Sequence, residues 1–156
     1  MLFIMLKITG TILVADNITK DKRMNHITVD KVELVKQNKN TILEVTLCNT
    51  DTEKYYLEKR ELPYHFKDTT YYRLSQNGKS ISKYKKTMKR RLPPSKFPDD
   101  YIAIEPKKCI TLDTNLNDFF HFDQNKPLTV SYYSYNSNPI TDELDLIQFE
   151  KTLTAH

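Results

Sequence analysis

Residues 26–49 read HITVDKVELVKQNKNTILEVTLCN and predict a β-hairpin. Apolar and polar residues alternate on both sides of a central polar cluster, which is the period of a strand that buries one face. In the second half, Leu43, Val45 and Leu47 fall on one face, and polar residues stand between them. The cluster QNKN at 37–40 is rich in turn-forming residues, so the two halves are expected to pair as antiparallel neighbours.

The same two-residue period continues through most of the chain. Further strands are expected within TEKYYLEK (52–59), TTYYRLSQ (69–76), KSISKY (79–84), DDYIAIEP (99–106), KKCITLDTNL (107–116) and PLTVSYYSYN (127–136). Asn77-Gly78 stands between two of them and predicts a tight hairpin, because a type I′ turn requires positive φ at both central residues. The segment ELDLIQFEKTL at 143–153 fits a helix or a strand, and a last strand is favoured. Short strands at this spacing predict a sandwich or barrel of antiparallel sheets.

Length and composition fit one domain spanning residues 1–156. Hydrophobic residues make up only 38% of the chain, yet ten Tyr and seven Phe are spread along it, which disordered segments lack. No repeat or linker divides the chain, and 15–26 is the one polar stretch expected to be mobile. Gly10 and Gly78 are the only glycines, so glycine-rich phosphate-binding loops are excluded.

The N-terminal segment MLFIMLKITGTILVA, residues 1–15, is expected to form a first β-strand. Three features argue against a secretory signal. The segment has no basic residues before its apolar part, and Lys7 interrupts that part. Cleavage after Ala15 would also place Leu13 where a small residue is required. It is also too short and polar to span a bilayer. The compartment therefore stays open: secreted or periplasmic if the segment is a signal, and otherwise cytoplasmic.

Candidate catalytic and metal-binding residues are few. Cys48 and Cys109 are expected to be small buried hydrophobes, and the alternative is a disulfide between facing strands, which would imply an oxidising compartment. The four His show no metal-ligand spacing, so no metal and no cofactor are expected. Asp99, Asp100 and Glu105 could form an acid–base set, but nothing predicts their burial, and no Ser stands in a nucleophile-elbow context. No catalytic residue is expected, and an enzyme is the least favoured function.

Between residues 43 and 135, a series of short motifs occurs in a fixed order. They are Leu47-Cys48-Asn49, Leu62-Pro63, Gly78 to Tyr84, Lys89-Arg90 with Pro93, Asp100-Tyr101-Ile102 with Pro106, and Val130-Ser131-Tyr132. In this order they resemble the non-catalytic N-terminal domain of deuterolysin-type (aspzincin) zinc metalloproteases. The resemblance implies an all-β fold, an antiparallel Ig-like β-sandwich of roughly seven to nine strands.

The sequence departs from that family in two ways. Lys85, Lys107 and Lys126 stand where the family has glycine, which changes the expected turn shapes but leaves the sandwich. The zinc-binding protease domain, with its HExxH motif, is not found in these 156 residues. The resemblance therefore implies a non-enzymatic protein-interaction module. Its partner is expected to be a protein, and the family suggests a protease that the module binds or inhibits.

A basic run at 83–91 gives the alternative function. Its Lys and Arg side chains could hold phosphates, with Tyr84 offering a stacking face. The favoured interpretation is an edge strand and its exit loop, where lysines prevent pairing with another sheet. If the run does bind anions, its ligand would be nucleic acid, polysaccharide or a membrane surface, and nucleic acid is the less favoured of these partners.

Tyrosine-rich segments indicate where a protein partner could bind. In SYYSY at 131–135, one face is expected to be core, and the other is expected to carry tyrosines to the surface. Tyr and Arg are enriched in protein interfaces. The residues expected at the partner surface are Tyr84, Lys89, Arg90, Arg91, Tyr133 and Tyr135.

Overall fold

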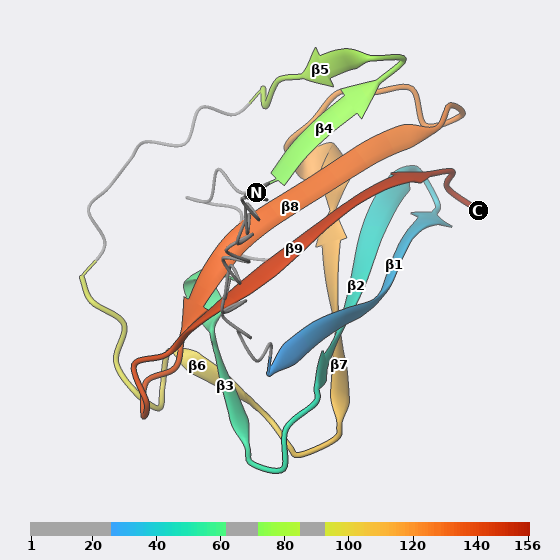
Figure 1. Ribbon diagram of the computed structural model, residues 1–156. Coiled ribbons are helices and arrows are strands. Elements are labelled where there is room, and N and C mark those ends of the chain that lie inside the picture. The colour runs from blue at the N-terminus through green and yellow to red at the C-terminus, as the bar shows by residue number, and fades with distance from the viewer. Residues whose placement is uncertain (1–25, 62–71, 85–92) are drawn as a thin grey trace, which may run out of the picture.

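The computed structural model describes residues 26–61, 72–84 and 93–156, which form β-strands joined by turns and two short 3₁₀ segments (Figure 1). The strands are β1 (Ile27–Gln37), β2 (Asn40–Asn49), β3 (Tyr55–Glu58), β4 (Tyr72–Gln76), β5 (Lys79–Ile81), β6 (Tyr101–Ile104), β7 (Cys109–Asn115), β8 (Leu128–Ser137) and β9 (Leu144–Leu153). The 3₁₀ segments are η1 (Lys59–Glu61) and η2 (Leu116–Asp118). The expected first strand at 1–15 and the expected mobile segment lie outside the described residues, apart from His26. No helix within the described ranges is long and apolar enough to cross a membrane.

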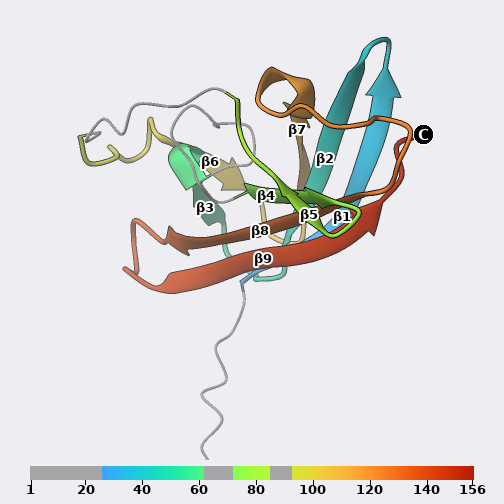
Figure 2. The same cartoon turned by 90° about the horizontal axis from the view of Figure 1, so that it is seen from above.

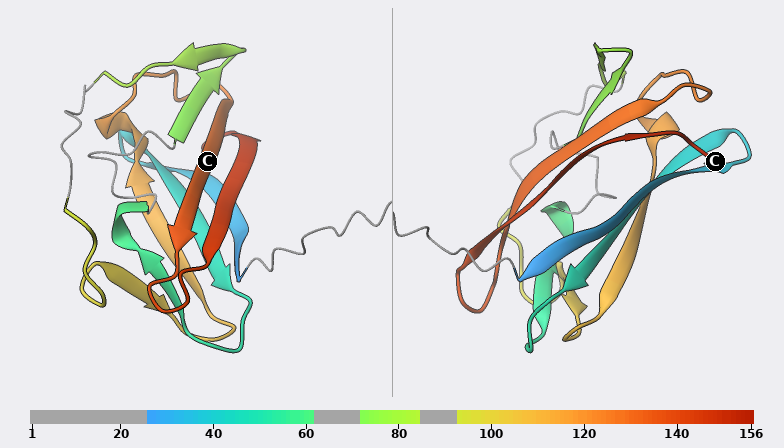
Figure 3. Two further views of the ribbon diagram at one scale, coloured as in Figure 1. Left: turned by 60° about the vertical axis from the view of Figure 1, so that its left-hand side comes forward. Right: turned by 45° about the vertical axis from the view of Figure 1, so that its right-hand side comes forward.

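Two larger sheets face each other and enclose the core (Figures 2 and 3). One has the strand order β1-β2-β7 and the other β5-β4-β8-β9, and a two-stranded sheet of β3 and β6 lies at one end. All of these pairs are antiparallel. The fold is therefore an all-β, antiparallel Ig-like sandwich, as the sequence predicts.

The hairpin predicted for residues 26–49 is confirmed. Strands β1 and β2 pair from Ile27↔Asn49 to Gln37↔Asn40, with a bulge between Val29 and Lys31. Leu43, Val45 and Leu47 are all buried, as the alternation requires. The four-stranded sheet adds Leu74 of β4, Val130 and Tyr132 of β8 and Ile147 of β9 to this core, and Leu116 and Phe120, which follow β7, also belong to it.

Strand β9 settles the ambiguous segment 143–153 in favour of a strand. It pairs with β8 along its whole length, from Ser137↔Leu144 to Leu128↔Leu153. Asp145 and Ile147 point inward and are buried. Leu144, at the start of the strand, points outward and is exposed. This is the period of a strand, and it makes β9 an edge of the four-stranded sheet.

The tight turn at Asn77-Gly78 is also confirmed. Asn77 has φ 51° and Gly78 has φ 73°, as a type I′ turn requires at its two central residues. The turn joins β4 to β5, the short outer strand of the four-stranded sheet.

Gly78→Ala is expected to lower the free energy of unfolding by about 1 kcal/mol, because alanine is strained at positive φ. A Cβ at this position would meet no atom within 4 Å, so the cost comes from the backbone alone. Gly78→Asn should cost less, because asparagine tolerates this conformation. Urea unfolding of the three proteins measures the order, and equal stability of the Ala variant and the wild type would contradict the turn assignment.

Cys48 and Cys109 form a disulfide between β2 and β7. The favoured sequence interpretation, two buried hydrophobes, is therefore wrong, and the alternative is the one observed. The register places the two residues directly opposite each other, with 4.0 Å between their Cα atoms. Cys109 is exposed rather than buried, because odd-numbered positions of β7 point away from the core.

Two buried asparagines join the sheets through hydrogen bonds. Asn136 of β8 is fully buried, and its side-chain nitrogen donates to the Tyr55 hydroxyl at 2.8 Å and to the Tyr56 carbonyl at 3.0 Å. Its side-chain oxygen accepts from the Glu58 amide at 2.8 Å. Asn49, at the end of β2, donates in the same way to the Ile104 carbonyl of β6 at 3.0 Å. The two-stranded sheet is thus attached to both larger sheets by buried amide groups.

Candidate functional site

The outer face of the four-stranded sheet carries a pair of exposed tyrosines. Along β8, Leu128, Val130 and Tyr132 point to the core, so Tyr133 and Tyr135 point outward and are 48% and 43% exposed. Their hydroxyl oxygens lie 2.7 Å apart, and their rings meet edge to face with centroids 5.5 Å apart. Each tyrosine therefore holds the other in place on the surface.

Apolar side chains extend this face toward the β8–β9 turn. Leu146 lies opposite Tyr135 across the two strands, and Leu144 lies opposite Ser137. Leu144 is 64% exposed, and Ile140 in the turn is 65% exposed. We call Tyr133, Tyr135, Leu144 and Leu146 the outer tyrosine face. Such a grouping of large exposed side chains marks an interaction surface more often than a scattered set does.

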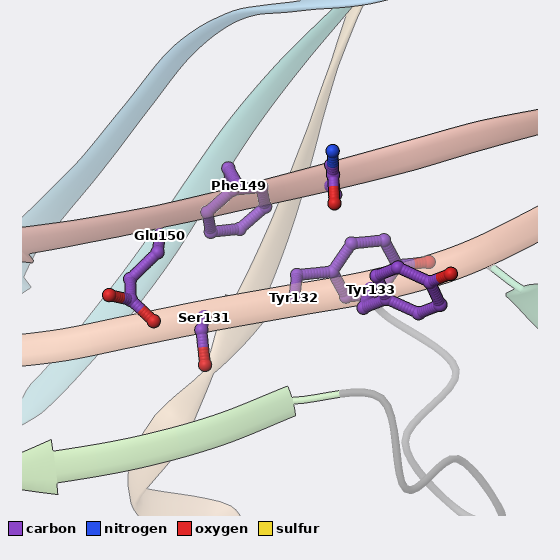
Figure 4. Close-up of a pocket in the computed structure, with 6 residues that line it drawn as sticks. Ser131, Tyr132, Tyr133, Phe149 and Glu150 are labelled. Atoms are coloured by element: carbon purple, nitrogen blue, oxygen red, sulfur yellow. The ribbon is translucent and has the colours of Figure 1, made fainter.

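A groove lies beside Tyr133 on the same side of the sheet (Figure 4). Its volume is about 490 Å³, and it is lined by Ser131, Tyr132, Tyr133, Gln148, Phe149 and Glu150. Tyr132 and Phe149 belong to the inner layer, where their rings stack with centroids 5.7 Å apart. The side chains that a ligand would meet are therefore those of Ser131, Tyr133, Gln148 and Glu150.

Tyr84, another residue expected at the partner surface, lies against a turn instead of the outer tyrosine face. Its hydroxyl donates to the Asn117 carbonyl at 2.9 Å, and its amide donates to the Phe119 carbonyl at 3.1 Å. Its ring stacks on His121 with centroids 4.2 Å apart. Tyr84 is still 41% exposed, but His121 covers one face of the ring that sequence reasoning expected to be available for stacking.

The basic run is described only at its beginning. Lys83 pairs with Phe120 in an isolated β-bridge, and its ammonium lies 5.9 Å from the Phe120 ring centroid. Burial lowers the pKa of Lys83. Lys89, Arg90 and Arg91 lie outside the described residues, so their place relative to the tyrosines stays a prediction.

The carboxylates considered for acid–base chemistry hold turns and surface ion pairs. Asp100 accepts a hydrogen bond from the Lys96 amide at 2.8 Å, and Glu105 pairs with Lys54 at 2.8 Å. Within ranges 26–61, 72–84 and 93–156, no group of three His, Cys, Asp or Glu side chains is placed to hold a metal ion.

A partly buried polar cluster, which alternation alone does not predict, lies near the start of β1 and β9. Asp145 is only 3% exposed, and one of its carboxylate oxygens accepts a hydrogen bond from the His26 amide at 3.3 Å. The His26 ring is bound to Asp51, with 2.7 Å between Nδ1 and Oδ2. Burial and the nearby Asp145 carboxylate raise the pKa of Tyr55. The cluster joins β1 to β9, and its one sequence signal was a charged residue at an inward position of a strand.

No known protein-family model matches the chain, and no curated protein matches it significantly. Function is therefore inferred from the residues and their geometry.

Proposed function

We propose that the protein is a non-enzymatic β-sandwich module that binds another protein through the outer tyrosine face. The observation that carries the proposal is the exposed, mutually bonded pair Tyr133 and Tyr135, with exposed Leu144 farther along the same face. Tyrosines held on a sheet lose little side-chain freedom on binding and present apolar rings with polar tips. Apolar side chains around them supply the water-excluding contacts of an interface core.

A protease is the first partner to test. The resemblance to the N-terminal domain of deuterolysin-type zinc metalloproteases is the argument for it, since that domain lies beside a protease. In this reading the module would bind or inhibit the protease. Anion binding by 83–91 is a weaker candidate, because Lys83 lies over Phe120 and the Tyr84 hydroxyl bonds to Asn117. Binding through phosphates or sulfates would weaken steeply with salt, which separates the two functions.

The double variant Tyr133→Ser/Tyr135→Ser is expected to lose the partner. Immobilised wild type and variant would be compared for the proteins that they retain from an extract of the native host, by quantitative mass spectrometry. Two interface tyrosines at hot-spot strength predict a loss of about tenfold or more in the amount retained. Because both side chains are on the surface, the fold should lose little stability.

Two matched variants control this experiment. Tyr133→Phe/Tyr135→Phe keeps the rings and should retain most of the partner. Thr46→Ala/Thr111→Ala removes a hydroxyl pair, 3.0 Å apart, from the outer face of the other large sheet and should change nothing. If the serine variant folds and retains the same proteins in the same amounts as the wild type, the outer tyrosine face is not the interface.

A further inference from the structure

The groove beside Tyr133 combines a carboxylate, an amide, a hydroxyl and an aromatic ring. Ser131 lies opposite Glu150 and Tyr133 lies opposite Gln148, so four outward side chains come from two neighbouring cross-strand pairs. Strands in a sheet are ~4.8 Å apart, which places these side chains within reach of one bound group. Figure 4 shows Glu150 and Ser131 at one end of the labelled side chains and Tyr133 at the other.

Glu150 gives the groove its charge. It is exposed, and within the described ranges it takes part in none of the salt bridges that the structure forms. Arg73 lies on β4, the other neighbour of β8, and is paired with Ser131. Among the described residues, no ion pair joins Arg73 to Glu150. The carboxylate is therefore available to a cation that comes from outside the chain.

A guanidinium group fits these four side chains better than other common groups. It is planar, so it can stack on the Tyr133 ring, and it donates two parallel hydrogen bonds to a carboxylate. Its remaining N–H groups suit the oxygens of Gln148 and Ser131. A partner's carboxylate would be repelled by Glu150, and an apolar side chain would desolvate Glu150 without a hydrogen bond in return.

We propose that this groove binds an arginine side chain of the protein partner. The proposal rests on the proposed function, because it names the anchor of the partner that the outer tyrosine face binds. Arginine is favoured over lysine, since the lysine ammonium has neither the planar shape nor the paired donors.

The test uses Nα-acetyl-arginine N-methylamide as a probe, with the matching citrulline derivative as its uncharged isostere. Chemical shifts of the backbone and of the Gln148 side-chain amide would be followed by NMR up to tens of millimolar probe. The arginine probe should shift signals of Ser131, Tyr133, Gln148 and Glu150 in a saturable way. Loss of the charge-assisted pair predicts about twofold to fivefold weaker binding of the citrulline probe, and the same weakening for the arginine probe on Glu150→Gln.

Asp113→Asn is the matched control, because Asp113 is an exposed carboxylate on the outer face of the other large sheet. It should bind the arginine probe as the wild type does. No saturable shifts in the groove, equal binding of the citrulline probe, or unchanged binding by Glu150→Gln would each overturn the proposal.

Partner capture separates this proposal from the proposed function. If capture depends on Tyr133 and Tyr135 but the probe does not bind, the interface stands and the arginine anchor is wrong. If the probe binds through Glu150 but the Tyr133→Ser/Tyr135→Ser variant retains as much partner as the wild type, the groove binds guanidinium and the proposed interface is wrong.

Discussion

Asn136→Leu is expected to lower the free energy of unfolding by about 4 kcal/mol, because it leaves buried backbone groups without partners at ~1–3 kcal/mol each. The amide of Glu58 and the carbonyl of Tyr56 both bond to the Asn136 side chain, as does the Tyr55 hydroxyl. Leucine has a similar volume but can neither donate nor accept. These bonds also attach β3 to β8, so their loss should loosen the two-stranded sheet.

Urea unfolding measures the loss, and hydrogen exchange locates it. The amide of Glu58 should exchange much faster in the variant. Amides in the middle of β2 should exchange faster only by as much as the loss of global stability requires. Asn125→Leu is the control: the Asn125 side chain accepts one exposed hydrogen bond, from Lys36 at 3.3 Å. Substitution at such a site should cost no more than ~0.5 kcal/mol. A loss below about 1 kcal/mol for Asn136→Leu would show that this asparagine does not hold β3.

Local patterns predicted the strands because strand formation on a half-buried sheet leaves a local signature. The alternation of Leu43, Val45 and Leu47 placed these residues in the core, and Asn77-Gly78 gave the turn between β4 and β5. Both depend on residues that are neighbours in sequence. The same alternation in SYYSY predicts that Tyr133 and Tyr135 face outward, which the structure confirms.

Pairings between distant strands could not be predicted in this way. Strand β7 lies beside β2, and β6 pairs with β3 rather than with either larger sheet. Any strand with one apolar face satisfies the same pattern, so the sequence leaves the neighbour undetermined. The disulfide could not be predicted for the same reason, because whether Cys48 meets Cys109 depends on the β2–β7 register.

The candidate site shows the same division. The exposure of Tyr133 follows from its position in β8, but the groove beside it needs Gln148 and Glu150 of β9 in register. Tyr84 was expected to offer a free stacking face, and its stacking on His121 depends on a bridge between residues far apart in sequence. Buried polar groups such as Asp145 are recognised only once their distant partners are known.

Removing the disulfide with Cys48→Ala/Cys109→Ala is expected to lower the free energy of unfolding by about 4 kcal/mol. The bond closes a loop with a sequence separation of 61. A crosslink of this span restricts the unfolded chain, and the loop-entropy relation gives ~4 kcal/mol. Because a typical domain has only about 5–15 kcal/mol of stability, such a loss should produce a visible unfolded fraction near body temperature.

The wild type treated with a reductant should unfold at the same urea concentration as the alanine variant, because both lack the crosslink. The alanine variant itself should not respond to the reductant, which separates the bond from other effects of the reagent. Thiol titration of the unreduced protein in denaturant should find no free cysteine. Two free thiols there, or wild type and variant equally stable without reductant, would restore the interpretation of Cys48 and Cys109 as unpaired residues. A confirmed difference would link the stability of the β2–β7 pair to the redox state of its surroundings, since disulfides persist in oxidising compartments and are reduced elsewhere.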